Sequence, residues 1–252
     1  MQGLHDKFKD KGLVILAPHC QDADREKLEV FVLKHGITYP IGMKCDTSGY
    51  PGQGIPRAAL IGVDGTVLWQ GNPNGGNLEK MIEAEIPKVD VFGERGLVKS
   101  QKAIATKLMQ RKLGAAHAEL KKLAPDGGTA PAEVQAALTR VEAYAKALLD
   151  RARKAQEAGD VGRATDLGTE CEKSFKGSDL EAEATKFLAE LKKTEGYDKA
   201  MKAYKAWAML EKKAADKPKD AATLAKSVAA GFADTYYGKR AEVVARLIES
   251  SK

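Results

Sequence analysis

The chain has 252 residues, 43% of them hydrophobic, and its 41 Lys and Arg exceed its 35 Asp and Glu, which gives a formal net charge of +6. Since most domains have roughly 100–200 residues, this length predicts two domains. We expect no membrane span, because no run of about 18 apolar residues occurs. Nor do we expect a signal peptide at Met1, because the opening residues are too polar.

Charge divides the sequence in two. Residues 1–92 hold 10 Lys and Arg and 12 Asp and Glu, whereas the remainder holds 31 and 23. A basic helical region could meet nucleic acid, anionic lipid or an acidic protein. Lys and Glu interleave through 186–213, which favours a solvated helix surface, so no nucleic-acid partner is expected.

The first ninety residues begin with a helix that ends at Gly12, a residue placed as its C-cap. Residues 13–17 are continuously apolar, which predicts a parallel strand buried on both faces and ended by Pro18. The acidic residues 21–24 can cap the helix that follows, and Gly36 closes that helix.

The next elements are strands. Asp64-Gly65 is a strong hairpin signal between apolar runs at 58–63 and 66–69. Residues 71–76 are Gly- and Asn-rich but lack the Lys-Ser/Thr of a phosphate loop, so we interpret them as a turn before a helix at 78–86. The predicted order is helix, strand, helix, strand, strand, helix.

Three stretches of this region, 4–16, 24–41 and 54–69, resemble a known family. The second contains His-Gly-Ile-Thr-Tyr-Pro, and the third is similar to the Gly-x-Pro-x-x-x-x-Ile-Asp-x-x-Gly of thioredoxin-like redoxins. These are membrane-linked thiol:disulfide oxidoreductases and thiol-specific antioxidant proteins. The resemblance covers about a third of the chain.

The resemblance implies an incomplete α/β thioredoxin-like domain over 1–90, with Val14 and Leu60 in one sheet. It implies a cis bond between Ile55 and Pro56, beside which an extended substrate pairs, so Ile55, Pro56 and Arg57 are the expected substrate-binding residues. A trans proline that begins a strand stays open. Protein thiols or disulfides are the implied partners, no cofactor is expected, and relatives of this type commonly face the periplasm.

The family's Cys-x-x-Cys, which precedes the first helix, is absent from the sequence together with the strand that leads into it. Cys20, which follows a strand and precedes a helix, is the candidate stand-in for catalysis, although Asp22 and Asp24 disfavour a thiolate there. Cys45 lies in a Gly-rich loop, and Cys171 fits a small buried hydrophobic residue on a helix. The spacing of these cysteines allows one disulfide and matches no metal site.

The histidines are scattered along the sequence without the spacing of metal ligands, so we expect no metal site. They are His5, His19, His35 and His117.

Residues 94–252 are rich in Ala, Leu, Lys and Glu, which predicts a helical domain. Gly and Pro divide it into seven predicted helices. These run over 96–123, 132–158, 160–174, 179–193, 197–215, 219–232 and 235–250.

A repeat lies in this half at an offset of 57 residues, with Phe175 and Ser178 corresponding to Phe232 and Thr235. The pattern resembles tetratricopeptide-like helical hairpins, which usually present a concave surface to a protein partner. An ordinary helical bundle stays open. The aromatic residues of this half have helical spacing and are expected in its core; they are Tyr197, Tyr204, Trp207, Tyr236 and Tyr237.

Three functions follow from these patterns. The first is a redoxin, either thiol:disulfide oxidoreductase or peroxide reductase, whose reactive cysteine pair is absent from this chain. The second is a redox-inactive thioredoxin-like module with a helical protein-interaction scaffold, and the third is nucleic-acid binding. A domain without its first strand also leaves a sheet edge or an apolar face open, which predicts marginal stability for residues 1–90.

Overall fold

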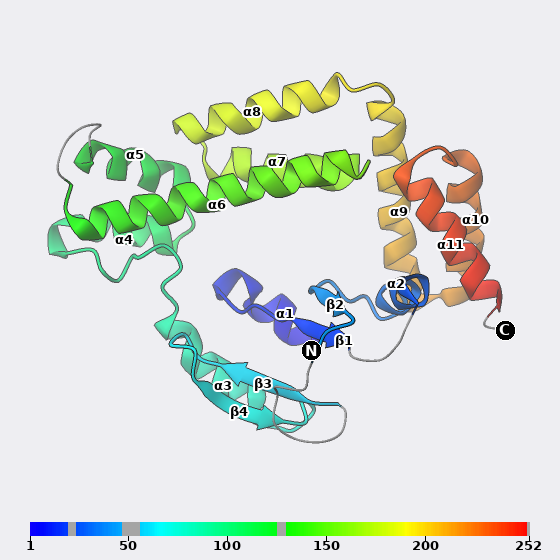
Figure 1. Cartoon of the computed structure of the whole chain (residues 1–252), viewed down its shortest axis with the longest axis horizontal. Coiled ribbons are helices and arrows are strands. Elements are labelled where there is room, and N and C mark those ends of the chain that lie inside the picture. The colour runs from blue at the N-terminus through cyan, green and yellow to red at the C-terminus, as the bar shows by residue number, and fades with distance from the viewer. Residues whose placement is uncertain (20–23, 47–55, 125–129, 251–252) are drawn as a thin grey trace. The chain divides into compact units, whose positions relative to one another are not determined.

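The computed structural model describes residues 1–19, 24–46, 56–124 and 130–250, and the chain divides into two compact units (Figure 1). An α/β unit comprises residues 1–89 together with 211–218. A helical unit comprises residues 90–210 and 219–250.

The α/β unit contains short helices and strands in the predicted order, with one further strand, β2, that the sequence did not predict. They are α1 (Gln2–Phe8), η1 (Lys9–Lys11), β1 (Ala17–His19), α2 (Arg25–Lys34), β2 (Ile41–Met43), β3 (Ala58–Ile61), β4 (Val67–Gly71), α3 (Leu78–Glu85) and η2 (Ile86–Lys88).

Local chemistry sets several of these boundaries as the sequence predicts. Gly12 follows η1 at φ 107°, a left-handed conformation that costs glycine little. The Asp24 carboxylate accepts a hydrogen bond from the backbone N–H of Glu26 and so caps α2. Gly65 takes φ 84° in the turn before β4, and Asp64 accepts a hydrogen bond from the backbone N–H of Thr66.

The strands form two separate pairs in the described residues. β1 pairs in parallel with β2, with Ala17 opposite Ile41, and β3 pairs antiparallel with β4, with Leu60 opposite Trp69. The prediction of one sheet that holds both Val14 and Leu60 is therefore wrong. A parallel pair and a hairpin can each form alone, but no described strand lies between them to join their ladders.

The strand predicted at 13–17 is also wrong in its bounds, because β1 begins only at Ala17. Val14 and Leu16 are each 72% exposed, while Ile15 between them is buried at 9%. This alternation differs from the burial on both faces that we expected. β2 offers only three residues as a partner, so the ladder does not reach further toward Leu13.

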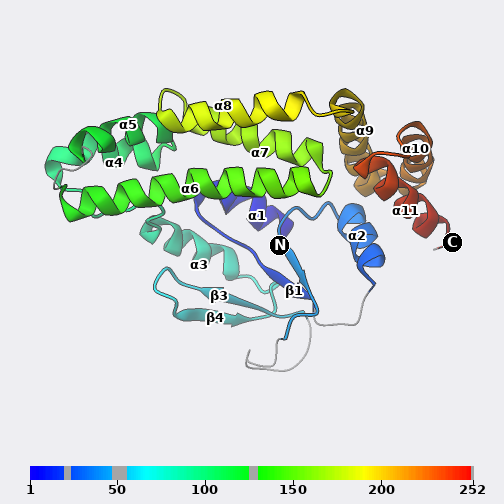
Figure 2. The same ribbon diagram turned by 45° about the horizontal axis from the view of Figure 1, so that its top comes forward.

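The core of the α/β unit joins α1, β3 and α3. Phe8, Leu60, Leu78 and Ile82 form one buried cluster, so α1 and α3 cover the same face of the β3–β4 hairpin (Figure 2). At the surface, Lys7 of α1 pairs with carboxylates of α3. Its Nζ lies 2.6 Å and 2.7 Å from the two carboxylate oxygens, which belong to Glu79 and Glu83.

The helical unit consists of one short 3-10 helix and eight α-helices in its described residues. They are η3 (Lys99–Gln101), α4 (Lys102–Met109), α5 (Leu113–Leu123), α6 (Ala132–Glu157), α7 (Val161–Ser174), α8 (Asp179–Lys192), α9 (Tyr197–Asp216), α10 (Pro218–Gly231) and α11 (Tyr236–Ser250). The last six residues of α9 and the first of α10 are assigned to the α/β unit.

The single helix predicted over 96–123 is wrong, because the chain turns between α4 and α5. Arg111 takes φ 57° at this turn, a left-handed conformation that is rare outside glycine. Its guanidinium carbon lies 4.9 Å from the centre of the Phe92 ring. The turn lets Leu108 and Leu113 both enter the core.

From α6 onward the helices begin and end within one residue of their predicted bounds. α6 packs along α7, and α7 packs along α8 (Figures 1 and 2). The 57-residue offset carries α7 onto α10 and the start of α8 onto the start of α11. From α6 onward, the helical unit thus forms two successive groups of three helices, α6–α8 and α9–α11.

The turn between α7 and α8 and the turn between α10 and α11 contain the same side-chain hydrogen bond. Ser178 Oγ donates to the carbonyl of Phe175 at 2.8 Å, and Thr235 Oγ1 donates to the carbonyl of Phe232 at 2.8 Å. Ala164 and its counterpart Ala221 are both fully buried. The repeat found in the sequence therefore corresponds to a repeated structural unit.

None of the helices built from the described residues combines the length and the apolar character needed to cross a lipid bilayer.

Candidate functional site

The entry to the β3–β4 hairpin carries the expected substrate-binding residues that the structure describes. Pro56 and Arg57 are exposed and lead directly into β3. The Arg57 guanidinium donates a hydrogen bond to Oε1 of Gln70 on β4 at 3.1 Å. Ile55 lies outside the described residues, so the cis bond before Pro56 stays a prediction.

Cys45 lies just beyond β2, at the carboxyl end of the parallel pair. Its backbone N–H donates to the carbonyl of His19 at 3.3 Å, and its Sγ lies 3.7 Å from the carbonyl oxygen of Met43. The thiol is free and half-buried. Cys20, the other candidate near this end of the sheet, lies outside the described residues.

Cys171 is fully buried in α7 beside α6, with its Sγ 3.9 Å from the carbonyl oxygen of Ala145. Burial raises the pKa of this thiol to about 11, and the carboxylates of Glu183 and Glu170 add to the effect. The thiol is therefore protonated at neutral pH and is a poor nucleophile. This agrees with its interpretation as a small hydrophobic residue of the core.

Cys171 supplies no activated thiol. An activated cysteine needs a neighbouring cation, a helix N-terminus or a second thiol to favour its thiolate. Cys171 has carboxylates near it instead. The described residues also contain no group of three or more His, Cys, Asp or Glu arranged to hold a metal ion.

His117 is the polar residue that the sequence did not single out. It is 1% exposed on α5, with Nε2 3.4 Å from a carboxylate oxygen of Glu142 and Nδ1 3.3 Å from one of Asp179. Its signal was available, because Leu113, Ala116, His117 and Leu120 share one apolar face. The imidazole thus joins α5 to α6 and α8 and has a structural role.

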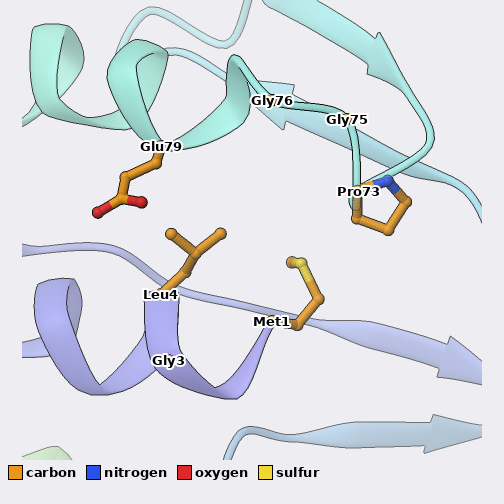
Figure 3. Close-up of a pocket in the computed structure, with 7 residues that line it drawn as sticks. All are labelled: Met1, Gly3, Leu4, Pro73, Gly75, Gly76 and Glu79. Atoms are coloured by element: carbon orange, nitrogen blue, oxygen red, sulfur yellow. The ribbon is translucent and has the colours of Figure 1, made fainter.

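A hollow of about 500 Å³ lies between the beginning of α1 and the loop before α3 (Figure 3). Its walls include the side chains of Met1 and Leu4, with Pro73 and Glu79 opposite. Glu79 is its one charged residue and is paired with Lys7. The loop is the turn that we predicted, closed by the backbone N–H of Gly75 donating to the carbonyl of Asn72. The hollow contains no nucleophile.

The aromatic residues of the helical unit lie where α7 meets α9 and α11. Trp207 and Tyr237 are 2% and 4% exposed, which confirms them as core residues. The other three residues predicted in the core are half-buried; they are Tyr197, Tyr204 and Tyr236. The hydroxyl of Tyr237 donates to Asp160, the N-cap of α7, and that of Tyr204 donates to Asp166. These contacts join the two groups of three helices.

Comparison with known proteins adds no relative. No protein-family model, no curated protein and no solved structure matches this chain.

Proposed function

We propose that the chain is a thioredoxin-like redoxin that binds protein thiols or disulfides beside Pro56 and Arg57. The observation that carries the proposal is the position of these two residues. They are exposed at the entry to β3, and the elements around them follow the order helix, strand, helix, strand, hairpin, helix. The buried thiol of Cys171 is protonated at neutral pH, so the proposal assigns the chain a substrate-binding part and places its reactive cysteine pair elsewhere.

Binding of a disulfide-bonded protein tests the substrate-binding part. We expect oxidised insulin to bind the chain in a titration followed by fluorescence anisotropy, and Pro56→Ala to weaken the affinity about tenfold by altering the backbone at the hairpin entry. Asn74→Ala is the control, because Asn74 lies in the exposed turn before α3 and not at the entry to the hairpin, and this variant should leave the affinity unchanged. Equal binding by both variants, or no binding by the parent chain, contradicts the proposal.

An activity assay on the natural protein tests whether it carries out thiol chemistry. The natural N-terminus of the protein, determined by mass spectrometry, shows whether a Trp-Cys-x-x-Cys segment precedes these residues. With that segment the protein should reduce insulin or peroxide, since a paired thiol at a helix N-terminus is a thiolate near neutral pH. A natural protein that reduces neither substrate would remove the redoxin proposal.

A second candidate, a redox-inactive module with a helical scaffold that binds a protein partner, rests on a different observation. The groups α6–α8 and α9–α11 repeat one unit, and stacked helical units of this kind offer extended binding surfaces. The two candidates differ in their dependence on cysteine. If the scaffold is the function, the double variant Cys20→Ser, Cys45→Ser retains the same partner at the same affinity, measured by calorimetry. A loss of binding in this variant counts against the scaffold.

A further inference from the structure

The positive charge of the chain is concentrated on one part of the helical unit. Residues 97–124, which include η3, α4 and α5, hold seven Lys and Arg against one Glu, so their net charge of +6 equals that of the whole chain. Residues 132–192, which include α6, α7 and α8, hold 10 Lys and Arg against 12 Asp and Glu. We call residues 97–124 the basic segment. Its two α-helices lie beside the beginning of α6 (Figures 1 and 2).

Four lysines of the basic segment are exposed and form no ion pair with another described residue. They are Lys99, Lys102, Lys112 and Lys122. The one carboxylate of the segment, that of Glu119 on α5, pairs with Lys107 of α4. This ion pair joins the two helices side by side, so the four exposed lysines belong to one continuous surface whose charge is not neutralised locally.

Three of these lysines do not stabilise the helices that carry them. Lys99 and Lys102 begin η3 and α4, and Lys112 is the N-cap of α5. The N-terminus of a helix carries a partial positive charge, which favours a carboxylate and repels a lysine. The first turns of α4 and α5 contain no acidic residue, whereas that of α8 contains Asp179 and Glu181. The lysines thus add to the positive potential of these helix ends.

Exposed apolar side chains lie among the lysines. Val98, Met109 and Leu123 are 49%, 63% and 42% exposed. Met109 follows Lys102 by seven residues on α4, so the two side chains share the face of the helix that points away from its buried side. Leu123 is adjacent to Lys122 at the end of α5. Basic and apolar side chains therefore occupy the same surface.

We propose that the basic segment binds the surface of an anionic lipid bilayer. The lysine ammonium groups contact the headgroup phosphates, and the side chains of Met109 and Leu123 enter the boundary between the headgroups and the acyl chains. The stems of the lysines lie along this apolar boundary while their charges stay at the headgroups. This contact involves neither a cysteine nor Pro56, so it is independent of the redoxin proposal.

A lipid surface fits the basic segment better than a nucleic acid does. Six of the seven basic residues are lysines, whose flexible point charges suit a fluid layer of phosphates, whereas Arg suits bidentate recognition. The segment contains no Phe, Tyr or Trp on which a base could stack. Met109 and Leu123 gain an apolar environment in a bilayer and would gain none along a phosphate backbone.

Vesicle flotation of the full chain tests the proposal. We expect binding to phosphatidylcholine vesicles that contain about 30% phosphatidylglycerol and none to phosphatidylcholine alone, because the lysines respond to a negative surface potential. Raising the salt concentration from about 0.05 M to about 0.5 M should release the chain from the vesicles. A chain that binds neither kind of vesicle, or both equally, overturns the proposal.

Charge variants locate the binding surface. The quadruple variant Lys99→Gln, Lys102→Gln, Lys112→Gln, Lys122→Gln should lower the partition coefficient at least about 100-fold. The matched control removes the same charge from exposed residues in and near α8 and α9, and should retain the parent coefficient within about threefold. It is Lys186→Gln, Lys192→Gln, Lys193→Gln, Lys202→Gln. Equal losses in the two variants would show an effect of net charge alone and would contradict the assignment to the basic segment.

The apolar residues distinguish a lipid from a nucleic acid. Met109→Gln, Leu123→Gln should lower the partition coefficient about tenfold, because less apolar area enters the bilayer. Met209→Gln, at a residue of α9 that is 60% exposed, is the control and should leave it unchanged. Circular dichroism verifies that every variant is folded. An unchanged coefficient in Met109→Gln, Leu123→Gln, or tighter binding to duplex DNA than to the anionic vesicles, overturns the proposal.

Discussion

At the scale of single residues, the raised pKa of Cys171 links stability to pH. A thiol with pKa about 11 in the folded state and 9.0 as its ordinary value keeps its proton on folding. Between these values the unfolded state binds fewer protons, so the contribution to stability is complete below pH 9 and is lost as the pH rises toward 11. We expect Cys171 to lower the free energy of unfolding by about 1 kcal/mol from pH 8 to pH 10.

Variants isolate this contribution from that of the lysines and tyrosines. Urea unfolding at pH 8 and pH 10 should show a loss about 1 kcal/mol smaller in Cys171→Ala than in the parent chain. Cys45→Ala, whose thiol is half-buried, should lose as much stability as the parent. If Cys171→Ala and the parent lose equal stability over this range, the thiol is not protected by burial.

Gly162 tests the contact between the two groups of three helices. A Cβ at this position would lie 2.2 Å from Cγ of Tyr204, closer than packed atoms approach. Gly162→Ala should therefore destabilise the helical unit by about 1–3 kcal/mol, despite the higher helix propensity of alanine. Gly231→Ala is the matched control in α10, where no atom lies within 4 Å of the added Cβ, and it should be neutral or stabilising. Equal melting temperatures for the two variants would contradict the close contact.

At the scale of elements, the turns that precede α8 and α11 differ in whether the serine or threonine side chain caps the helix that follows. Thr235 Oγ1 donates to the carbonyl of Phe232 and also accepts from the backbone N–H of Gly238 at 3.0 Å. Ser178 makes the first bond, but no side-chain cap bond to α8 is present. Thr235→Ala should cost about 1–2 kcal/mol, because it removes an N-cap as well as the turn bond. Ser178→Ala should cost less.

Thr235→Ser controls for the loss of the hydroxyl, since serine can make both bonds and should retain most of the stability. The free energies of unfolding come from urea titration followed by circular dichroism. A larger loss for Ser178→Ala than for Thr235→Ala would show that the cap contributes little at α11.

The helices of the second half of the chain could be predicted, because capping residues and glycines in the sequence mark where they begin and end. Asp160 accepts a hydrogen bond from the N–H of Arg163, and Gly177 and Gly196 take left-handed conformations between helices. The break at Arg111 could not be predicted, because residues 102–113 contain no glycine or proline and Gly114 beyond them lies within α5. Tertiary packing of Leu108 and Leu113 decides it.

In the first half of the chain, by contrast, the local pattern did not predict the extent of the strand. The apolar run at 13–17 predicts a strand, yet a strand needs a partner, and β2 supplies only three residues of ladder. Sequence pattern alone carries no information on whether the partner exists. The candidate site shares this limit, since Pro56 and Arg57 could be located from their resemblance whereas the burial of His117 between two carboxylates depends on how three helices pack.

At the scale of the whole molecule, the two units differ in how much apolar surface each encloses. The α/β unit has a buried cluster of Phe8, Leu60, Leu78 and Ile82, while α4 to α8 share a far larger continuous core. Large aliphatic side chains on the sheets and the segments beside them stay exposed in the α/β unit. They include Val14, Leu16, Ile61, Val63 and Val67.

Because stability follows buried apolar area, the α/β unit should open at a lower free energy than the helical unit. We expect native-state hydrogen exchange to be at least about 100-fold faster for the amides of β1 to β4 than for those in the middle of α6 and α7, equivalent to about 3 kcal/mol. Ala137→Gly, in the core of α6, is the control: it should accelerate exchange in the helical unit alone. Amides of the strands that exchange as slowly as those of α6 in the parent chain would contradict this difference in stability.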